Sequence, residues 1–237
     1  MKRLENKTAI ILAGGKGTRL QSVISEIPKP MAPINDTPFL TYLLNQCASG
    51  YITQVILAVG YKHKVIQDYY GNEYKGMNIL YSIEKSPLGT GGAIKKALKL
   101  VTGKIALILN GDSICKFDIP SFWNTHKKSD VIFSILTKRL TDFDRYGTVT
   151  SVKEKVTGFK EKRPTTEGLI NTGVYLINKL KFEEIEFPEV FSFEKEFMEK
   201  YVKQLSFHHH QTKGFFIDIG IPEDYLKAQE FLPVTFN

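Results

Sequence analysis

Three glycines within four positions, Gly14, Gly15 and Gly17, directly follow an apolar run that ends at Leu12 and Ala13. Glycine has no Cβ, so the backbone N–H groups of such a turn can approach a phosphate closely. Three basic side chains within and after the turn could neutralise the charge of a polyphosphate: Lys16, Arg19 and Lys29. The spacing predicts a phosphate-binding loop, and an ordinary tight turn between a strand and a helix is the alternative.

Two familiar nucleotide-binding loops do not fit this spacing. A Walker loop that starts at Gly14 would need glycine where Arg19 stands. The dinucleotide fingerprint that starts at Gly15 would need its third glycine where Leu20 stands, and no acidic residue follows the run at 54–59 to hold a ribose. The spacing therefore argues against a P-loop ATPase and against an NAD-dependent enzyme.

Two aspartates stand at the ends of separate apolar runs. Asp112 follows the run at 105–109, and Asp218 follows the run at 215–217. Mg²⁺ is commonly bound by one or two carboxylates together with phosphate oxygens and water. Two such carboxylates near a phosphate loop therefore indicate a Mg²⁺ site, whereas either aspartate alone is more typical of a turn cap.

A second glycine-rich loop, at residues 86–94, enters a predicted helix and contains Pro87, Gly89 and Thr90. A flat base could lie against the backbone of such a loop. Glu84, just before it, could accept two hydrogen bonds from adjacent donors, as guanine presents with its N1–H and its exocyclic amine. A solvated surface glutamate is the alternative for Glu84.

A further polar set lies in the second half of the chain. Glu161 and Asn171 could bond to sugar hydroxyls and Lys162 to a phosphate. The alternative is a solvated charged loop at residues 160–163. The three consecutive histidines at 208–210 are expected to be surface residues, because adjacent side chains on a strand point to opposite faces and cannot converge on one metal ion.

The elements that must position these residues alternate along the first half of the chain. Strands are predicted at 8–12, 54–59, 79–83, 105–109 and 131–136. Helices are predicted between them at 38–49, 62–70, 91–100 and 120–127. This order predicts an α/β fold with a three-layer, Rossmann-like, open and mainly parallel sheet that carries helices on both faces.

After about residue 145 the pattern changes to short strands at 148–152, 156–159 and 173–177, which predict a small antiparallel addition. A helix at 193–202, a strand at 215–217 and a helix at 222–231 complete the expected elements. Because ligands of open parallel sheets bind beyond the carboxyl ends of the strands, the glycine loop, Asp112 and Asp218 are expected at one edge.

Length and composition are those of one globular domain. The 237 residues, 42% hydrophobic and 24% charged, are expected to form a single domain over 1–237, with a nucleotide-binding half to about residue 110 and a sugar-phosphate half after it. The formal charge of +7 favours anionic small molecules as partners. No nucleic-acid-binding module is evident, and the sequence leaves open whether the chain forms a homo-oligomer.

No apolar run approaches the roughly 20 residues that a membrane-spanning helix needs. The first residues lead into a strand rather than a signal sequence, so we expect a cytoplasmic protein with no membrane partner. Cys47 and Cys115 have no apparent metal or nucleophile partner and are expected to be reduced thiols.

Taken together, the motifs resemble the sugar-phosphate nucleotidyltransferase family, and they occur in order over nearly the whole chain. They lie at residues 12–20, 28–31, 87–92, 110–112, 161–162, 171–173 and 218–220. Within the family, the segments at 145–147, 158–162 and 216–225 are most similar to the bacterial D-glycero-α-D-manno-heptose 1-phosphate guanylyltransferases. The resemblance implies the nucleotide-diphospho-sugar transferase fold.

The resemblance also implies a set of roles. Nucleotide binding is assigned to Leu12, Ala13, Gly14, Gly15, Gly17, Thr18, Arg19, Lys29, Glu84, Pro87, Gly89 and Thr90. Sugar-phosphate binding is assigned to Asn110, Gly147, Glu161, Lys162, Asn171 and Thr172, Mg²⁺ binding to Asp112 and Asp218, and catalysis to Arg19, Lys29 and Asp112. Thr172 departs from the glycine or alanine that is common there, and its hydroxyl is expected to narrow the sugar pocket.

The implied reaction is Mg²⁺-dependent transfer of a nucleotidyl group from GTP to a sugar 1-phosphate, with release of pyrophosphate. The attacking phosphate is already ionised, so the reaction requires no protein nucleophile. Uridylyl, thymidylyl or mannose 1-phosphate guanylyl transfer is the alternative within the class. A sensor that binds sugar nucleotides without catalysis is the alternative from another class.

Overall fold

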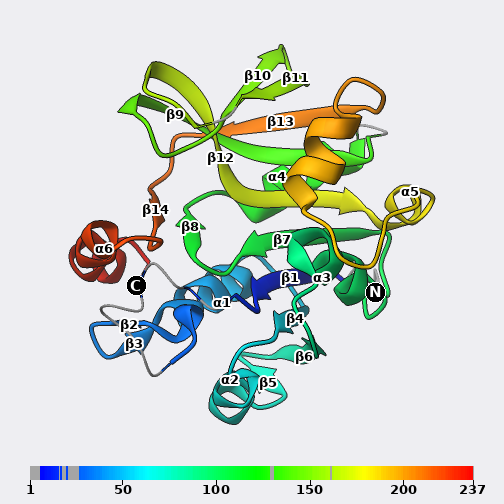
Figure 1. Cartoon of the computed structure of the whole chain (residues 1–237). Helices are drawn as coiled ribbons and strands as arrows, with labels where there is room; N and C mark the ends of the chain where they lie inside the picture. Colours follow the sequence, from blue (N-terminus) through cyan, green and yellow to red (C-terminus); the bar gives the residue numbers. More distant parts are fainter. Residues whose placement is uncertain are drawn as a thin grey trace.

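A central mixed sheet with helices on both faces forms the frame of the computed structural model (Figure 1). The structure describes residues 6–15, 17, 20, 27–128, 131–160 and 162–236. Within these residues the sheet has ten strands, in the order β10 (Thr148–Val152), β11 (Lys155–Lys160), β13 (Phe207–Thr212), β9 (Phe133–Phe143), β12 (Thr165–Asn178), β7 (Ile105–Asn110), β1 (Thr8–Ala13), β4 (Gln54–Val59), β6 (Met77–Ile83) and β5 (Glu73–Tyr74).

The parallel part of the sheet consists of β6, β4, β1 and β7, paired in that order. Strands β1, β4 and β7 are almost continuously apolar because both of their faces are buried, which is why the sequence predicted them, whereas β6 is only partly buried. The chain places β4 and β6 on one side of β1 and then returns to place β7 on the other. Such a reversal opens a crevice beyond the carboxyl ends of β1 and β7, where ligands of doubly wound sheets bind.

The antiparallel part continues the same sheet. The long strand β12 pairs antiparallel with both β7 and β9, and β10 and β11 form a hairpin beyond them. The predicted α/β class with added antiparallel strands is confirmed. Strand β13 was not among the elements predicted, although strand geometry was assumed there for the three histidines; it lies parallel to β9, and the histidines are half-buried.

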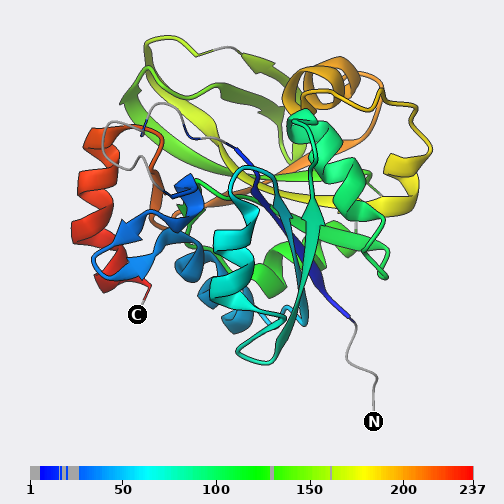
Figure 2. The same ribbon diagram turned by 60° about the horizontal axis from the view of Figure 1, so that its bottom comes forward.

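The helices form a layer on each face (Figures 1 and 2). One core contains side chains of α1 (Phe39–Ser49), α2 (His63–Tyr70), α4 (Ile119–Lys128) and α6 (Pro222–Thr235). The other contains side chains of α3 (Gly89–Leu98), α5 (Lys179–Glu183) and the π-helix η3 (Phe193–Glu199). Alternate residues of β1 supply the two cores, since Ala9 and Ile11 belong to the first and Ile10 to the second.

Short elements connect this frame to the site. The 3₁₀ helix η2 (Lys29–Met31) precedes the small pair β2 (Pro33–Ile34) and β3 (Thr37–Pro38). A second small pair joins β8 (Ser113–Cys115) to β14 (Phe216–Asp218). Among the described helices, none combines the length and the hydropathy needed to cross a membrane.

The two cysteines are free and buried. Burial raises the pKa of both the Cys47 and Cys115 thiols to about 12. Because only the thiolate is a good nucleophile, both residues are inert at neutral pH.

Candidate active site

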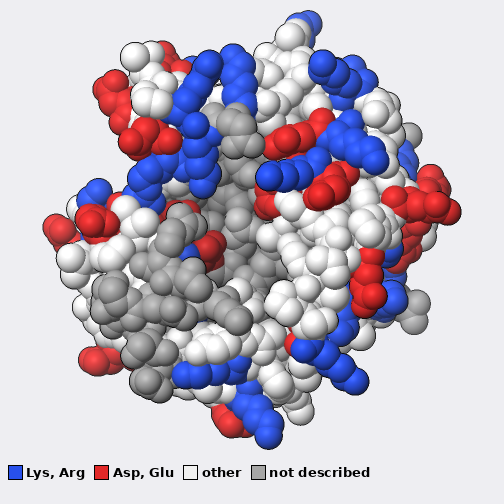
Figure 3. Space-filling view, in the orientation of Figure 1, with Lys and Arg blue, Asp and Glu red and all other residues white. Residues whose placement is uncertain are grey.

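A cavity of about 630 Å³ opens at the carboxyl ends of the parallel strands. It opens on the face shown in Figure 3, which is hollowed near its middle and has Lys and Arg side chains along the upper rim of the hollow. The lining residues come from the ends of β1, β4 and β7, the loops after β1, β4, β6, β7 and β14, the 3₁₀ helix η2 and the start of α3. They are Leu12, Gly14, Gly15, Gly17, Lys29, Pro30, Ala58, Gly60, Tyr61, Glu84, Lys85, Ser86, Pro87, Gly89, Thr90, Ala93, Asn110, Gly111, Asp112 and Gly220.

Glycines at the ends of β1 and β7 allow the two strand ends to meet. The Gly111 N–H donates to the carbonyl of Leu12 at 3.0 Å, and a Cβ on Gly111 would lie 2.4 Å from that carbonyl oxygen. Gly17 has a φ of +61°, and a Cβ there would lie 2.7 Å from Cβ of Lys29. The glycines therefore bring backbone and Lys29 together at the phosphate-binding edge that the sequence predicted.

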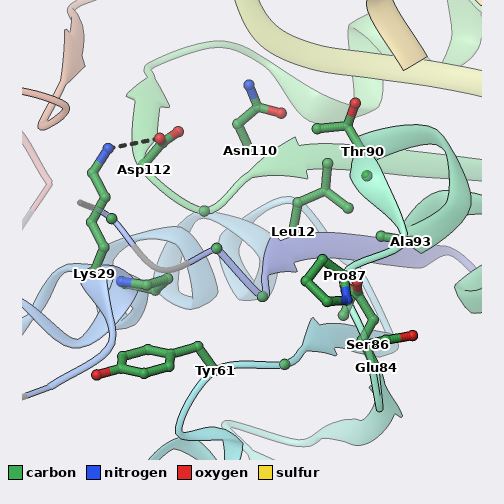
Figure 4. Close-up of a pocket in the computed structure, with 18 of the residues that line it drawn as sticks. Leu12, Lys29, Tyr61, Glu84, Ser86, Pro87, Thr90, Ala93, Asn110 and Asp112 are labelled. Atoms are coloured by element: carbon green, nitrogen blue, oxygen red, sulfur yellow. Dashed lines mark hydrogen bonds and ion pairs between the residues drawn. The ribbon is translucent and has the colours of Figure 1, made fainter. Parts of the chain in front are cut away.

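Lys29 and Asp112 form an ion pair at one end of the cavity (Figure 4). Lys29 Nζ lies 2.7 Å from Asp112 Oδ2. The Lys29 side chain is 9% exposed, whereas that of Asp112 is 39% exposed and faces the cavity. The geometry places one cation and one carboxylate where a polyphosphate would enter.

Asp218 is brought beside Asp112 by the small β8–β14 pair. In that pair Asp218 lies opposite Ser113, and the Ile219 N–H donates to the carbonyl of Asp112 at 2.9 Å. Burial raises the pKa of Asp218, and the nearby Asp112 carboxylate raises it further, while Lys29 opposes both effects. Two neighbouring carboxylates that repel each other are an environment that favours a bound cation.

Glu84 lies at the other end of the cavity, near Ser86 and Pro87 (Figure 4). Its Oε2 accepts a hydrogen bond from the Leu88 N–H at 3.0 Å. A Cβ on Gly14 would lie 2.8 Å from Glu84 Oε1, so a larger residue at this position would displace the carboxylate. Burial raises the pKa of Glu84, and the Leu88 N–H and Lys96 partly offset that rise.

Thr90 also lines the cavity, but protein groups already satisfy its hydroxyl. Thr90 Oγ1 donates to Glu194 Oε2 at 2.7 Å and accepts from the Phe193 N–H at 2.9 Å. The polar atom of this side chain therefore faces the protein, and a nucleotide in the cavity could contact Thr90 only through its backbone or methyl group. Gly89 beside it has a φ of +72°, which few residues other than glycine adopt.

The predicted sugar-phosphate residues are only partly brought together. Asn110 lines the cavity, and its Oδ1 is buried without a hydrogen-bond partner among the described residues. Asn171 donates through Nδ2 to the hydroxyl of Tyr175 at 2.8 Å. Gly147, on the turn before β10, and Lys162, after β11, are not part of the cavity wall described above.

Thr172 requires a correction. It is 1% exposed, and its hydroxyl donates to the carbonyl of Leu136 at 2.8 Å inside the sheet. The hydroxyl therefore completes the backbone hydrogen bonding at the irregular pairing of β9 and β12 and does not narrow a sugar pocket.

The remaining predicted residues divide into two groups. Ala13 is buried at the end of β1, so only its backbone can reach a ligand. The predicted roles of Lys16, Thr18, Arg19 and Glu161 concern positions outside the described residues.

Some neighbours of the site were missed by reasoning on individual motifs. Gly60 and Tyr61 line the cavity because β4 ends at the same edge as β1 and β7, and this strand order was the available signal. Arg145 forms an ion pair with the 8% exposed Asp224 at the start of α6. The Tyr146 ring lies 5.5 Å, centroid to centroid, from that of Phe216 on β14, which places this segment close to Asp218; burial and Asp218 raise the pKa of Tyr146 to about 12.

The donor set is consistent with Mg²⁺ bound between protein and substrate. No group of three or more His, Cys, Asp or Glu side chains within the described ranges could hold a metal ion alone. Asp112 and Asp218 would supply two carboxylates, and Mg²⁺ usually completes its shell with phosphate oxygens and water. The residues present therefore fit a metal that arrives with a triphosphate.

The sequence is similar to known proteins over almost its whole length. Residues 8–234 match the nucleotidyl transferase family. The chain is 48% identical over 224 residues to the D-glycero-alpha-D-manno-heptose 1-phosphate guanylyltransferase of Aneurinibacillus thermoaerophilus, covering 94% of this chain and 97% of that protein. It is 47% identical over 218 residues to the protein of the same name from Campylobacter jejuni, covering 92% and 96% of the two chains.

A solved structure is similar over the same range. The crystal structure of HddC from Yersinia pseudotuberculosis complexed with GMP-PN superposes with a TM-score of 0.84 at 38% sequence identity. The match covers 94% of this chain and 98% of the other.

Proposed function

The chain belongs to the nucleotidyl transferase family, and from this premise we propose that it transfers the GMP group of GTP to D-glycero-α-D-manno-heptose 1-phosphate, giving GDP-heptose and pyrophosphate. The observation that carries the proposal is identity of 47–48% to two guanylyltransferases of that name, over more than nine-tenths of each chain. The geometry of the cavity supports it, because a base-binding end and a phosphate-binding end lie in one crevice.

The reaction forms one bond and breaks one bond at the α-phosphorus of GTP. A phosphate oxygen of the sugar 1-phosphate attacks, and the bond between the α-phosphorus and the bridging oxygen breaks. Pyrophosphate leaves with the electron pair of that bond. Because the attacking phosphate is ionised at neutral pH, the protein contributes alignment and charge stabilisation rather than a covalent intermediate.

The two ends of the cavity divide this task. Glu84 would accept hydrogen bonds from the N1–H and the exocyclic amine of guanine, since its Oε1 lies against Gly14 at the cavity wall. Lys29 would bind the triphosphate from its position under Gly17. Asn110 would accept a hydrogen bond from the sugar, because its Oδ1 is buried and otherwise unpaired among the described residues.

Mg²⁺ is the metal that we propose for the carboxylate pair. Asp112 and Asp218 would hold it, and the bound ion would offset negative charge on the phosphates during transfer. Asp112 and Asp218 repel each other, which is one cause of the raised pKa of Asp218, and a cation held between them would offset this repulsion. Lys29, no longer needed to balance Asp112, would then be available to the phosphates.

A pyrophosphate-release assay tests the proposal. GTP, UTP, dTTP, CTP and ATP are each combined with heptose, mannose and glucose 1-phosphates in the presence of Mg²⁺. We expect release to be fastest with GTP and D-glycero-α-D-manno-heptose 1-phosphate. Faster release with UTP or dTTP would contradict the guanylyl assignment, and faster release with mannose 1-phosphate would contradict the sugar assignment.

The same assay separates the enzyme from a sensor. A protein that binds sugar nucleotides to regulate a partner would bind GDP-heptose but release no pyrophosphate with any pair of substrates. The ion pair of Lys29 and Asp112 beside Asp218 supports catalysis, because binding alone does not require a metal-activating set.

A further inference from the structure

The glycine-rich loop at residues 86–94, called the base-binding loop below, is hydrogen-bonded to a segment about 100 residues later in the chain. The Phe191 N–H donates to the carbonyl of Leu88 at 3.0 Å, and the Gly91 N–H donates to the carbonyl of Phe191 at 3.0 Å. These two bonds join the base-binding loop and the start of α3 to residues 187–194, which lie before and at the start of η3 and form the rear brace.

The glycines of the base-binding loop have no space on the side of the rear brace. A Cβ on Gly89 would lie 2.5 Å from the carbonyl oxygen of Phe191, and a Cβ on Gly91 would lie 2.2 Å from its ring. A Cβ on Gly92 would lie 2.4 Å from the carbonyl oxygen of Glu189. These glycines therefore permit close packing against the rear brace, in addition to any approach of a base from the cavity.

A side-chain network completes this contact. Thr90 Oγ1 donates to Glu194 Oε2 at 2.7 Å, and Ser192 Oγ donates to the same oxygen at 2.9 Å. The Phe193 N–H in turn donates to Thr90 Oγ1 at 2.9 Å. Figure 4 shows the Thr90 hydroxyl pointing away from Glu84 and Pro87. The Glu194 carboxylate is thus hydrogen-bonded to Thr90 of the loop and is not among the residues that line the cavity.

The rear brace is itself fixed by aromatic packing. The rings of Phe187 and Phe191 stack with centroids 4.6 Å apart and planes inclined by 2°. Phe193 is fully buried, and its centroid lies 5.4 Å from that of Tyr175 and 5.8 Å from that of Phe133. The hydrogen bonds to Thr90 therefore connect the glycine-rich loop to the buried core that contains Phe191 and Phe193.

We propose that Thr90 and Glu194 are positioning residues that hold the base-binding loop in the geometry required by GTP without contacting the nucleotide. The inference rests on the proposed function, since it assumes that the loop carrying Glu84 and Pro87 receives the base. It gives the aromatic-rich segment at 187–197 a role beyond core packing.

Binding of GTP to the intact chain tests the proposal directly. Calorimetric titration is performed with a non-hydrolysable GTP analogue on the wild type and on Thr90→Val, Thr90→Ser, Glu194→Ala and Glu194→Gln. Valine has the shape of threonine but no hydroxyl, so Thr90→Val should weaken binding about 10-fold, the cost of a buried hydrogen bond to a charged group. Thr90→Ser retains the hydroxyl and should bind within about 2-fold of the wild type.

The glutamate variants provide the complementary comparison. Glu194→Gln retains an acceptor oxygen and should bind better than Glu194→Ala, which should resemble Thr90→Val. The affinity of the double variant Thr90→Val/Glu194→Ala for the GTP analogue should lie within about 2-fold of that of either single variant, because both substitutions remove the same interaction. Losses that simply multiply would contradict a shared network.

Steady-state kinetics distinguish positioning from general damage. We expect Thr90→Val to raise KM for GTP while kcat, and KM for the sugar 1-phosphate at saturating GTP, stay within about 2-fold of the wild type. Thr125→Val on α4, which removes a hydroxyl bond to the Ser121 carbonyl, is the matched control and should change neither constant.

The outcomes separate this inference from the proposed function. If the wild type binds the GTP analogue and Thr90→Val binds it equally well, the positioning role is wrong. If the wild type binds another triphosphate instead, the guanylyl proposal fails, and the same comparison with that nucleotide decides the role of Thr90. Equal losses in both KM values would also overturn the inference, because they would indicate a general loss of structure.

Discussion

Lys29 and Asp112 form an ion pair of 2.7 Å that joins the turn after the glycine loop to the end of β7. The lysine is nearly buried, whereas the aspartate remains open to the cavity. This arrangement holds the ammonium group at the phosphate end of the site before any substrate arrives, so charge stabilisation requires little reorganisation.

Replacement of Lys29 by methionine tests this role. Lys29→Met removes the charge and keeps most of the packing beneath Gly17, so the fold should persist while kcat/KM falls about 100-fold or more. Pyrophosphate release measures the rate, and thermal unfolding followed by circular dichroism checks the fold. Lys179→Met is the control: it breaks the ion pair between Lys179 and Glu183, neither of which lines the cavity, and should keep wild-type rates.

The two aspartates should respond differently in stability although both are needed for turnover. Asp112→Ala should nearly abolish pyrophosphate release and leave the fold intact. Asp218→Asn should also abolish it, but its stability at pH 7 should equal or exceed that of the wild type, because the substitution removes a buried charge that Asp112 repels. Near-normal release by either variant would refute the metal assignment.

Removal of divalent metal provides a separate test of the carboxylate pair. A chelator should eliminate pyrophosphate release, and excess Mg²⁺ should restore it. Bound Mn²⁺, detected by electron paramagnetic resonance, should increase when GTP is present, because Asp112 and Asp218 supply only part of the coordination shell. Full activity in the chelator would contradict Mg²⁺ dependence.

Glu84 should determine selection of the exocyclic amine of guanine. ITP lacks that amine, so the wild type should prefer GTP to ITP by about 10-fold or more in kcat/KM, the value of a hydrogen bond to a carboxylate. Glu84→Gln should reduce this preference to about 2-fold or less, mainly by losing GTP activity. A preference that survives the substitution would assign the amine to another residue.

His126 should make the fold sensitive to mild acid. Burial, with smaller effects of His208 and Lys181, lowers the pKa of His126 to about 4 from its ordinary value of 6.5. Between pH 6.5 and 4, His126 is protonated in the unfolded chain but not in the folded chain. The free energy of unfolding is therefore at its full value above pH 6.5 and declines as the pH falls toward 4. Between pH 7 and 5 the loss should be about 2 kcal/mol.

Urea unfolding at pH 7, 6 and 5 measures this loss. His126→Asn keeps a polar atom close to Ser134, the partner of Nδ1 at 2.8 Å, but it does not titrate. The difference between wild type and variant should therefore shrink as the pH falls. A difference that is independent of pH would show that His126 does not account for the acid sensitivity.

The sequence alone determined the strands of the parallel sheet and the residues at their ends. The runs at 8–12, 54–59 and 105–109 are continuously apolar because these strands are buried on both faces, and that pattern is visible without coordinates. Strand direction then places Gly14 and Asp112 at one edge, so the phosphate end of the site followed from order and spacing. The base-binding end at Glu84 followed in the same way from the strand before it.

Contacts between distant segments were decided only by the tertiary structure. The strand at 215–217 and the approach of Asp218 to Asp112 were predicted, but the means of that approach was not: the three-residue strand β8, too short for a periodic pattern, pairs with β14 in a small sheet of its own. Thr172 was expected at the sugar, but the irregular pairing of β9 and β12 turns its hydroxyl to Leu136. Side-chain direction at such irregularities depends on the partner strand, which local sequence does not specify.

The glycine-rich loops show the same division. Their composition predicted close approach of backbone to something, because only glycine lacks the Cβ that would prevent it. What approaches differs between the loops: Lys29 lies against Gly17, whereas Phe191 lies against Gly89 and Gly91. The glycines thus indicated positions where the backbone is closely approached. What approaches them was determined only by the folded chain, because segments about 100 residues apart meet there.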